Sequence, residues 1–382
     1  MSKFEKIRIR GYRRLFDVEI EMRPLTVVLG ANGSGKSSFL DAWSLLAASC
    51  RSQLAEKLSE YHGLNEILTR NHAQSLQFDV TMSSGEHHTP LEYDVEIAPK
   101  GAFYEIAQEN LIQKNKPNPQ PFRHIQSAGL DIRYYDIENK KIVRPTWNHN
   151  PLETSLAQVP KMFQGPETLR ERLASSTYYG PISVGAKAPV RLPQPMRPAT
   201  LPGMNGEELV SCLYYLRETD RDRFEVIEDT LSVAFPDFER LEFPPVAAGI
   251  LAMTWKDKNF PKPIYMHELS EGMIRFLWLL CTLQSRDLTA VTLLDEPEVS
   301  LHPELLNLLA DTMREAATRT QLIVATHSDR LVQSLRPEEI LISDIEDGVT
   351  KFTWADAMDL ERWLADYTLA ELWQMGRLGG RS

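Results

Sequence analysis

The sequence has 382 residues, and its 42 lysines and arginines against 53 aspartates and glutamates give a formal net charge of −11. Hydrophobic residues make up 42% and charged residues 25%, which excludes a wholly disordered chain and fits one large domain or two ordinary ones. No apolar stretch approaches the roughly 20 residues of a membrane-spanning helix, and the N-terminus lacks the apolar core of a signal peptide. We therefore expect a cytoplasmic protein with no membrane partner, whose acidic balance argues against coating nucleic acid through bulk charge.

The three cysteines, Cys50, Cys212 and Cys281, lie far apart, and no Cys-x-x-Cys pair is present. Zinc sites and small disulfide frameworks depend on closely spaced cysteines. We therefore expect buried, reduced thiols.

The N-terminal part shows strand patterns around one helix. Residues 3–9 and 17–22 alternate apolar and polar side chains, which predicts two antiparallel strands. Residues 25–29 form an apolar run, which predicts a strand buried on both faces, and an apolar-periodic helix follows over residues 37 to about 48. Alternation returns within residues 76–112, which we interpret as a meander of exposed edge strands.

The middle of the sequence is less regular. Residues 113–151 are rich in Asn, Gln, Lys and Pro, which predicts a loop-like insertion. A helical stretch is expected to start near Leu152, and residues 180–204 are rich in proline and should be extended. Helical periodicity resumes over residues 207–235.

The C-terminal part alternates between helix and strand patterns. These segments are residues 271–283, 290–294, 303–317, 321–325, 329–335 and 339–343. Strands that alternate with helices predict a parallel sheet with helices on its faces.

Residues 30–37 read GANGSGKS, a complete G-x-x-x-x-G-K-[ST] phosphate loop between a predicted buried strand and a predicted helix. Its glycines let backbone N–H groups turn toward phosphate oxygens, and the helix adds the positive end of its dipole. Lys36 is expected to reach the β- and γ-phosphates, and the Ser37 hydroxyl to bind Mg²⁺. The alternative, a purely structural glycine-rich turn, is disfavoured by this context.

An acidic pair ends the apolar run VTLLDE at residues 291–296. Asp295, at the end of the predicted strand, can hold Mg²⁺ through water, and Glu296 can polarise the attacking water. Alone this pattern is weak, but together with the phosphate loop it indicates a nucleotide-hydrolysing site.

Two further segments fit the same site. Residues 269–273 read LSEGM and open an apolar helix, so Ser270 and Gly272 can offer a hydroxyl and N–H groups to an anion, unless Ser270 simply caps the helix. Residues 321–328 read QLIVATHS, a predicted strand that ends in His327. A lone histidine there would be structural, but its place after the acidic pair lets it reach a γ-phosphate.

With these four segments in order, the sequence resembles the ABC-type ATPases of the RecF/SMC/OLD branch, and more narrowly the AAA-family ATPases of prokaryotic defence and repair systems. The resemblance covers most of the chain, through KIRIRGYRRLFDVEIEMRPLTVVLGANGSGKSSFLDAW, LSEGMIRFLWLL, LLDEPEVSLHPEL and QLIVATHSDRLV. It implies an α/β fold: an ABC-ATPase head with a mostly parallel core sheet, an antiparallel β subdomain and a small inserted helical lobe. It also implies that the protein binds ATP and Mg²⁺ and hydrolyses ATP to ADP and phosphate.

The resemblance assigns roles to individual residues. Asp295 is the Walker B residue that holds the metal with Ser37, and Glu296 and His327 are the catalytic acid and the switch histidine, which act with Lys36. Ser270 and Gly272 belong to the signature that contacts ATP from the opposite protomer. The residues of the phosphate loop that bind the nucleotide are Gly30, Asn32, Gly33, Ser34, Gly35, Lys36, Ser37 and Ser38.

Other positions match less closely. Arg13, in the GYRRL segment, lies where relatives contact nucleotide near the phosphate loop, and Ser300 falls in the D-loop region. For the glutamine of the Q-loop, Gln158 is the first choice and Gln164 its rival.

The resemblance divides the chain into four parts. Residues 1–112 form an N-terminal ATPase half with the phosphate loop and antiparallel strands, and residues 113–266 form an insertion with a helical, proline-rich lobe. Residues 267–355 form the C-terminal ATPase half with the signature, Walker B and the switch histidine, and residues 356–382 form a tail.

The implied function is a homodimeric switch, with a higher oligomer left open, in which two protomers enclose two ATP molecules and hydrolysis opens the dimer. It would control a separate effector protein, such as a nuclease acting on DNA or RNA, in a defence or DNA-repair system. Only about 55 residues follow His327, too few for the toprim domain of OLD nucleases, so a nuclease is expected on another chain. The alternatives are a stand-alone RecF-like repair ATPase that binds DNA, and a transporter ATPase subunit, which the EPEVSLHP segment disfavours.

Arginines offer one candidate surface for nucleic acid. Solvated surface is the commoner role of such residues. The candidates for a basic patch are Arg170, Arg172, Arg191 and Arg197.

The tail carries an apolar stripe, in which Leu369, Leu372 and Trp373, with Met375, share one helix face. Such a stripe either folds back on its own core or docks a partner chain. Both interpretations remain open from the sequence.

Overall fold

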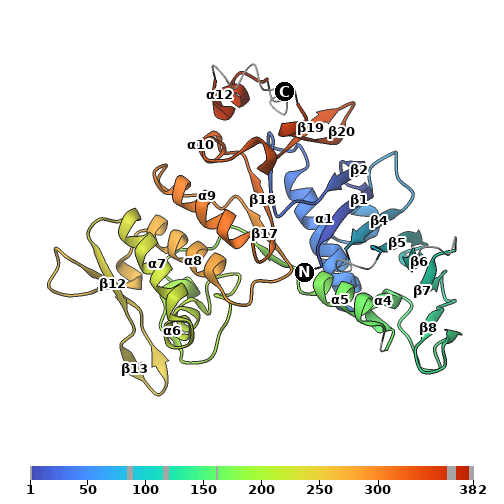
Figure 1. Ribbon diagram of the computed structural model, residues 1–382, viewed down its shortest axis with the longest axis horizontal. Coiled ribbons are helices and arrows are strands. Elements are labelled where there is room, and N and C mark those ends of the chain that lie inside the picture. Colours follow the sequence, from blue (N-terminus) through green and yellow to red (C-terminus); the bar gives the residue numbers. More distant parts are fainter. Residues whose placement is uncertain (1, 84–88, 115–119, 161, 359–366, 378–382) are drawn as a thin grey trace.

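A six-stranded sheet forms the centre of the protein in the computed structural model (Figure 1), which describes residues 2–83, 89–114, 120–160, 162–358 and 367–377. In spatial order its strands are β10 (Thr177–Tyr179), β17 (Val291–Asp295), β18 (Gln321–Thr326), β3 (Leu25–Leu29), β19 (Ile340–Glu346) and β20 (Val349–Trp354). All neighbours are parallel except β19 and β20. The mostly parallel core sheet expected from the alternating pattern is therefore confirmed.

A second, antiparallel sheet has eight strands. In spatial order they are β2 (Leu15–Glu21), β1 (Phe4–Tyr12), β4 (Leu76–Met82), β5 (Leu91–Lys100), β6 (Phe103–Gln113), β7 (Phe122–Ser127), β8 (Tyr134–Asp136) and β9 (Lys141–Val143). Two expectations are corrected here. Strands β4, β5 and β6 lie inside the sheet, not at its edge, because β4 pairs with β1 on one side and β7–β9, which form within the segment expected to be a loop, extend the sheet beyond β6. The sheet thus continues past residue 113.

The helices lie on both sides of the core sheet and in the lobes. They are α1 (Lys36–Ser49), α2 (Leu54–Glu60), α3 (Leu64–Ile67), α4 (Ser155–Gln158), α5 (Gln164–Ala174), α6 (Leu209–Thr219), α7 (Arg221–Ala234), α8 (Glu271–Gln284), α9 (Leu305–Ala316), α10 (Asp329–Gln333) and α12 (Leu369–Gln374). Short 3₁₀ turns lie at Pro189–Arg191 (η1), Met266–Glu268 (η2), Pro337–Glu339 (η3) and Ala355–Ala357 (η4).

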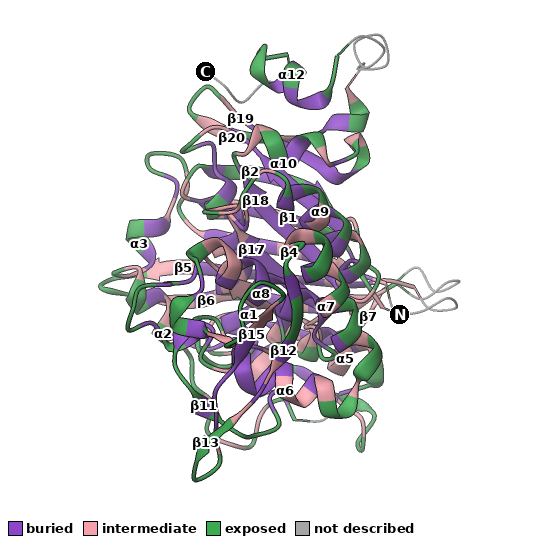
Figure 2. Ribbon diagram, turned by 90° about the vertical axis from the view of Figure 1, so that its left-hand side faces the viewer, coloured by how far each residue is buried: buried purple, intermediate pink, exposed green. Residues whose placement is uncertain are grey.

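The core strands serve two hydrophobic cores at once, because successive side chains of a strand point to opposite faces. Val324 on β18 belongs to one core, whereas its neighbours Ile323 and Ala325 belong to the other. The first core includes α6–α9, and the second includes α1, α5 and the antiparallel sheet. Figure 2 shows these buried residues gathered through the middle of the molecule. Burial on both faces explains why the core strands are continuous apolar runs.

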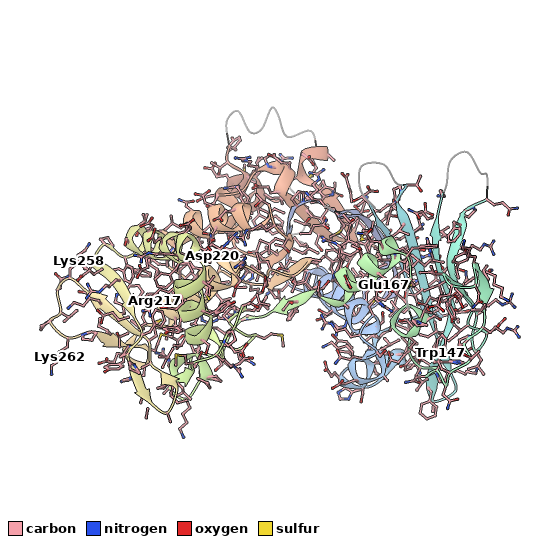
Figure 3. All side chains as sticks on the ribbon, turned by 60° about the horizontal axis from the view of Figure 1, so that its bottom comes forward. Trp147, Glu167, Arg217, Asp220, Lys258 and Lys262 are labelled. Carbon is pink, nitrogen blue, oxygen red and sulfur yellow. The ribbon has the colours of Figure 1, made fainter. Side chains whose placement is uncertain are left out.

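The helical lobe expected between the two ATPase halves is present. Its helices α6 and α7 pack with α8, and two small sheets border them. The strands of these sheets are β11 (Gln194–Pro195), β14 (Ile250–Leu251) and β13 (Pro245–Ala247), and β12 (Phe238–Glu242), β15 (Thr254–Asp257) and β16 (Ile264–Tyr265). In Figure 3, Lys258 and Lys262 mark the outer end of this lobe. Trp147 and Glu167 lie on the opposite side of the molecule, with the antiparallel sheet and α5.

The tail folds back on its own chain. Leu369, Leu372 and Trp373 are buried in the first core, where α12 contacts α10. The Gln374 side chain donates a hydrogen bond to Asp329 on α10 at 2.9 Å. Leu369, Leu372 and Trp373 are therefore covered by the protein itself, whereas Met375 of the same stripe is 46% exposed. Residues 359–366 and 378–382 of the expected tail lie outside the described residues.

Two other expectations can be compared with the structure. All three cysteines are free and buried, as expected. Among the described residues, no helix is long and apolar enough to cross a membrane.

Candidate functional site

The phosphate loop joins β3 to α1 and is held from behind by β19 and β20. The hydroxyls of Ser343 and Thr350 both donate to the backbone carbonyl of Ser34, each at 2.8 Å. Gly35 has a φ of 110°, and a Cβ there would lie 2.4 Å from the Thr350 hydroxyl. Only glycine fits this position without displacing the strand that supports the loop.

Lys36 lies inside the loop, with 6% of its surface exposed. Its ammonium group donates to the carbonyls of Gly30 at 2.8 Å and Ala31 at 3.0 Å. Burial lowers the pKa of Lys36, and the carboxylates of Glu296 and Asp295 oppose that shift because they stabilise the charged form. The lysine and the acidic pair therefore belong to one electrostatic site.

Asp295 ends β17 and receives a hydrogen bond that no sequence motif indicates. The hydroxyl of Tyr178, on the neighbouring strand β10, donates to Asp295 Oδ2 at 2.8 Å. Burial raises the pKa of Asp295, and the hydroxyls of Tyr178 and Ser37 counteract this by stabilising the carboxylate. The predicted pair of metal-binding residues, Ser37 and Asp295, is thus brought together.

Glu296 and His327 also meet, as their assigned roles require. Nδ1 of His327 lies 3.1 Å from Oε1 of Glu296. The backbone N–H of Glu296 donates to the carbonyl of Ala325, which fixes the turn after β17 to the end of β18. Glu296 has a φ of 49°, an uncommon conformation for a residue other than glycine and one that occurs at functional sites.

Glu298 is a second residue that the sequence motifs did not indicate. Its carboxylate accepts a hydrogen bond from the Thr326 hydroxyl, which in turn accepts one from the backbone N–H of Ser328 at 3.0 Å. Burial raises the pKa of Glu298. Glu298 therefore ties the loop after the acidic pair to the residues on both sides of His327.

Arg13 lies beside α1. It donates to Asp41 on that helix at 2.5 Å, and its guanidinium lies over the rings of Tyr12 and Tyr61. The next residue, Arg14, accepts a hydrogen bond through its carbonyl from the N–H of Thr350, the residue that supports the phosphate loop. The turn that carries Arg13 is thus connected to the phosphate loop through Arg14, and a contact between Arg13 and nucleotide stays a prediction.

The signature residues lie at the start of α8. Ser270 is exposed and caps the helix, since its hydroxyl accepts a hydrogen bond from the N–H of Met273 at 3.3 Å. A Cβ on Gly272 would lie 2.8 Å from the carbonyl of Ser300, so the helix start packs directly on the predicted D-loop. Within the described residues, no hydrogen bond joins Ser270 or Gly272 to the phosphate loop of the same chain.

The structure does not support the predicted Q-loop glutamine. Gln158 closes the turn before α4, where its amide donates to the carbonyls of Asn150, Glu153 and Thr154. Its Oε1 accepts from the N–H of Asn150. The rival, Gln164, begins α5. Tyr178, which lies 117 positions before Asp295 and belongs to no recognisable motif, does hydrogen-bond to Asp295.

Three of the four arginines named as candidates for a basic patch are engaged within the protein. Arg191 is only 8% exposed and donates to backbone carbonyls inside the protein. Arg170 and Arg197 form ion pairs with Glu167 and Glu208, respectively. These arginines therefore do not form a shared, free cationic surface.

The remaining loop positions fit a bound nucleotide. Asn32, Gly33 and Ser37 are exposed, Ser38 is half-buried, and the buried Ser34 hydroxyl has no partner among the described residues. Gly33 faces open space, because a Cβ there would meet no atom within 4 Å, and a glycine-rich loop at the start of a helix fits a phosphate group. Hydroxyl and carboxylate oxygens such as those of Ser37 and Asp295 are the donors that Mg²⁺ prefers.

A family model described as "AAA domain, putative AbiEii toxin, Type IV TA system" matches residues 25–333, which is more than half of the chain. The chain belongs to this family. A search of the curated proteins found no match. Residues 25–333, which include the phosphate loop, the acidic pair and His327, are therefore an AAA domain of this family.

Solved structures of Smc heads share the fold at low sequence identity. An Smc head bound to the C-terminal winged-helix domain of ScpA has a TM-score of 0.59 and 14% identity, over 93% of this chain and 100% of that one. A Pyrococcus furiosus Smc head with an extended coiled coil gives 0.55 and 13%, over 96% and 100%. A Pyrococcus yayanosii Smc head with a coiled coil and joint gives 0.51 and 12%, over 98% and 100%. The fold is therefore that of an SMC-like ABC ATPase head.

Proposed function

We propose that the protein is a dimeric switch ATPase, which hydrolyses ATP between two protomers and thereby controls a separate effector. The observation that carries this proposal is the convergence of Lys36, Asp295, Glu296 and His327 in one site, where His327 lies 3.1 Å from Glu296. These residues come from the ends of two core strands and from the helix after the phosphate loop. Their meeting supports phosphate chemistry rather than a purely structural loop.

Each residue has a distinct task in the proposed reaction. The N–H groups of the loop and the Lys36 ammonium hold the phosphates, and Ser37 and Asp295 would hold Mg²⁺. When bound, Mg²⁺ neutralises charge that develops on the phosphate oxygens. Glu296 orients the attacking water and accepts its proton, and His327, beside Glu296, donates a hydrogen bond toward the γ-phosphate.

Among the described residues, Ser270 and Gly272 make no hydrogen bond to the phosphate loop of their own chain. Ser270 and Gly272 are suited to contact a γ-phosphate, because Ser270 is exposed at a helix N-terminus. They serve a second protomer in our proposal, so that two ATP molecules are enclosed in a homodimer. Assembly beyond the dimer is left open.

The family description supports the proposed biological role. The description names a putative toxin of a type IV TA system, which supports a place in prokaryotic defence. Two of the similar Smc heads were solved bound to ScpA domains, which supports control of a separate protein partner. We propose a cytoplasmic defence or repair ATPase whose effector, such as a nuclease, lies on another chain.

The dimer can be tested with Glu296→Gln, which should bind ATP but hydrolyse it slowly. Light scattering should then show dimers with ATP and Mg²⁺ and monomers without them. Lys36→Ala, which removes the phosphate-binding ammonium, is the matched control and should stay monomeric. Glu296→Gln protein that binds ATP and remains monomeric at all accessible concentrations would contradict the proposal.

A further inference from the structure

The turn that precedes the signature helix is held from inside the protein by Arg191. This residue ends the 3₁₀ turn η1 in the proline-rich segment. Its Nη1 donates to the carbonyls of Met266 at 3.1 Å, His267 at 3.2 Å and Leu269 at 2.8 Å. Its Nε donates to the carbonyl of Val184 at 2.6 Å. One buried guanidinium therefore connects two segments that are 75 residues apart.

Arg191 binds four backbone carbonyls, whereas Arg51 and Arg319 each bind two. Many of the protein's other arginines pair with carboxylates near the surface, such as Arg197 with Glu208. Arg191 is only 8% exposed and is solvated by backbone carbonyls instead. A planar guanidinium can hold several acceptors in fixed directions, which a flexible ammonium cannot do equally well.

The clamped turn leads directly into the exposed end of α8. Leu269, whose carbonyl accepts from Arg191, is covalently joined to Ser270. On its other side, the helix start rests on the backbone of Ser300, whose carbonyl oxygen would lie 2.8 Å from a Cβ on Gly272. The orientation of the Ser270 hydroxyl and of the first N–H groups is thus set by Arg191 on one side and by Ser300 on the other.

We propose that Arg191 is a positioning residue for the Ser270–Gly272 turn, and that it acts on the ATP held by the phosphate loop of the opposite protomer. This inference rests on the proposed dimer. Arg191 does not contact the phosphate loop of its own chain in any of its four side-chain hydrogen bonds. Loss of Arg191 should therefore leave nucleotide binding by its own phosphate loop unchanged. It should slow hydrolysis of the ATP that is bound by the opposite protomer and contacted by the Ser270–Gly272 turn.

The test is complementation between two inactive variants. Arg191→Met should bind ATP within about threefold of the wild-type affinity, but lose at least about tenfold in hydrolysis. Glu296→Gln is inactive for a different reason and has an intact Ser270–Gly272 turn. Mixing the two before ATP is added should restore hydrolysis, because one site of the heterodimer combines the intact halves.

Two controls separate this role from folding and from failure of the dimer. Arg197→Met removes an exposed arginine of the same segment and should hydrolyse ATP at the wild-type rate. Ser270→Arg, mixed with Glu296→Gln, tests the composite site itself. If Arg191→Met does not fold, Arg191→Lys replaces it in the same mixture, with a smaller loss of hydrolysis expected.

The outcomes distinguish the two proposals. Restored hydrolysis in both mixtures supports the role of Arg191. If hydrolysis returns in the mixture with Ser270→Arg but not in the mixture with the Arg191 variant, Arg191 does not act on the opposite site. Near-wild-type hydrolysis by Arg191→Met alone would lead to the same conclusion. Failure of both mixtures would overturn the composite dimer and the inference with it.

Discussion

The hydrogen bond between Tyr178 and Asp295 offers a sharp test of the metal site. Tyr178→Phe removes one hydroxyl, which donates to Asp295 Oδ2 at 2.8 Å, and leaves the ring in place. A hydrogen bond to a charged group contributes about 1.5–3 kcal/mol, and loss of a group that orients a metal ligand weakens metal binding by about 10–100-fold. We therefore expect the Mg²⁺ concentration for half-maximal hydrolysis to rise by at least about tenfold.

The assay is steady-state hydrolysis at saturating ATP across a Mg²⁺ titration. Binding of nucleotide without metal should not change, because Tyr178 has no hydrogen bond to the phosphate loop among those described. Tyr179→Phe is the matched control: this neighbour on β10 packs its ring on Trp278 and should keep the wild-type Mg²⁺ dependence. An unchanged Mg²⁺ requirement in Tyr178→Phe would refute the role given to this hydrogen bond.

Three further predictions concern hydrolysis, the tail and pH. Glu296→Gln should slow hydrolysis by about 100-fold or more while ATP binding persists, and a near-wild-type rate would show that another group activates water. Trp373 is 3% exposed, so Trp373→Ala should lower the free energy of unfolding by about 3–5 kcal/mol, measured by denaturant titration; an unchanged midpoint would show that α12 is not part of the core. Burial lowers the pKa of His124 from 6.5 to about 4, so its contribution to stability is complete above pH 6.5 and is lost as the pH falls toward 4. Melting temperatures should therefore fall less steeply over that range in His124→Phe, and identical pH profiles would contradict this.

Much of the site was predictable because its chemistry lies in contiguous segments. The phosphate loop, the acidic pair and the strand before His327 each combine a local motif with a local strand or helix pattern. Parallel strands bring their carboxyl ends to one edge of the sheet, so motifs at the ends of β3, β17 and β18 were bound to meet. The motifs and the order of strands and helices along the chain were therefore sufficient to predict that these segments meet.

The residues that support the site could not be found in the same way. Tyr178, Glu298 and Arg191 act through hydrogen bonds to residues whose neighbourhood depends on the finished fold. The sequence favours a surface position for Arg191. Its burial depends on backbone carbonyls from a turn that is distant in the sequence, and no local pattern indicates them. The position of Gln158 in the chain is the only basis for predicting it as the Q-loop residue, whereas its amide closes a local turn.

The sequence does not predict the outer strands β8 and β9, for a different reason. The strands β8 and β9 have three residues each, too few to show a clear alternation, and they lie in a segment rich in residues that favour turns. They form because β7 already offers an unpaired edge, which no local pattern records.

The most direct test of a composite ATP site is the hydrolysis rate per protomer as a function of protein concentration, at saturating ATP and Mg²⁺. If Ser270 and Gly272 of one chain complete the site of another, the rate per protomer should rise with concentration and level off as dimers form. A rate per protomer that stays constant down to concentrations where light scattering shows only monomers would contradict the composite site.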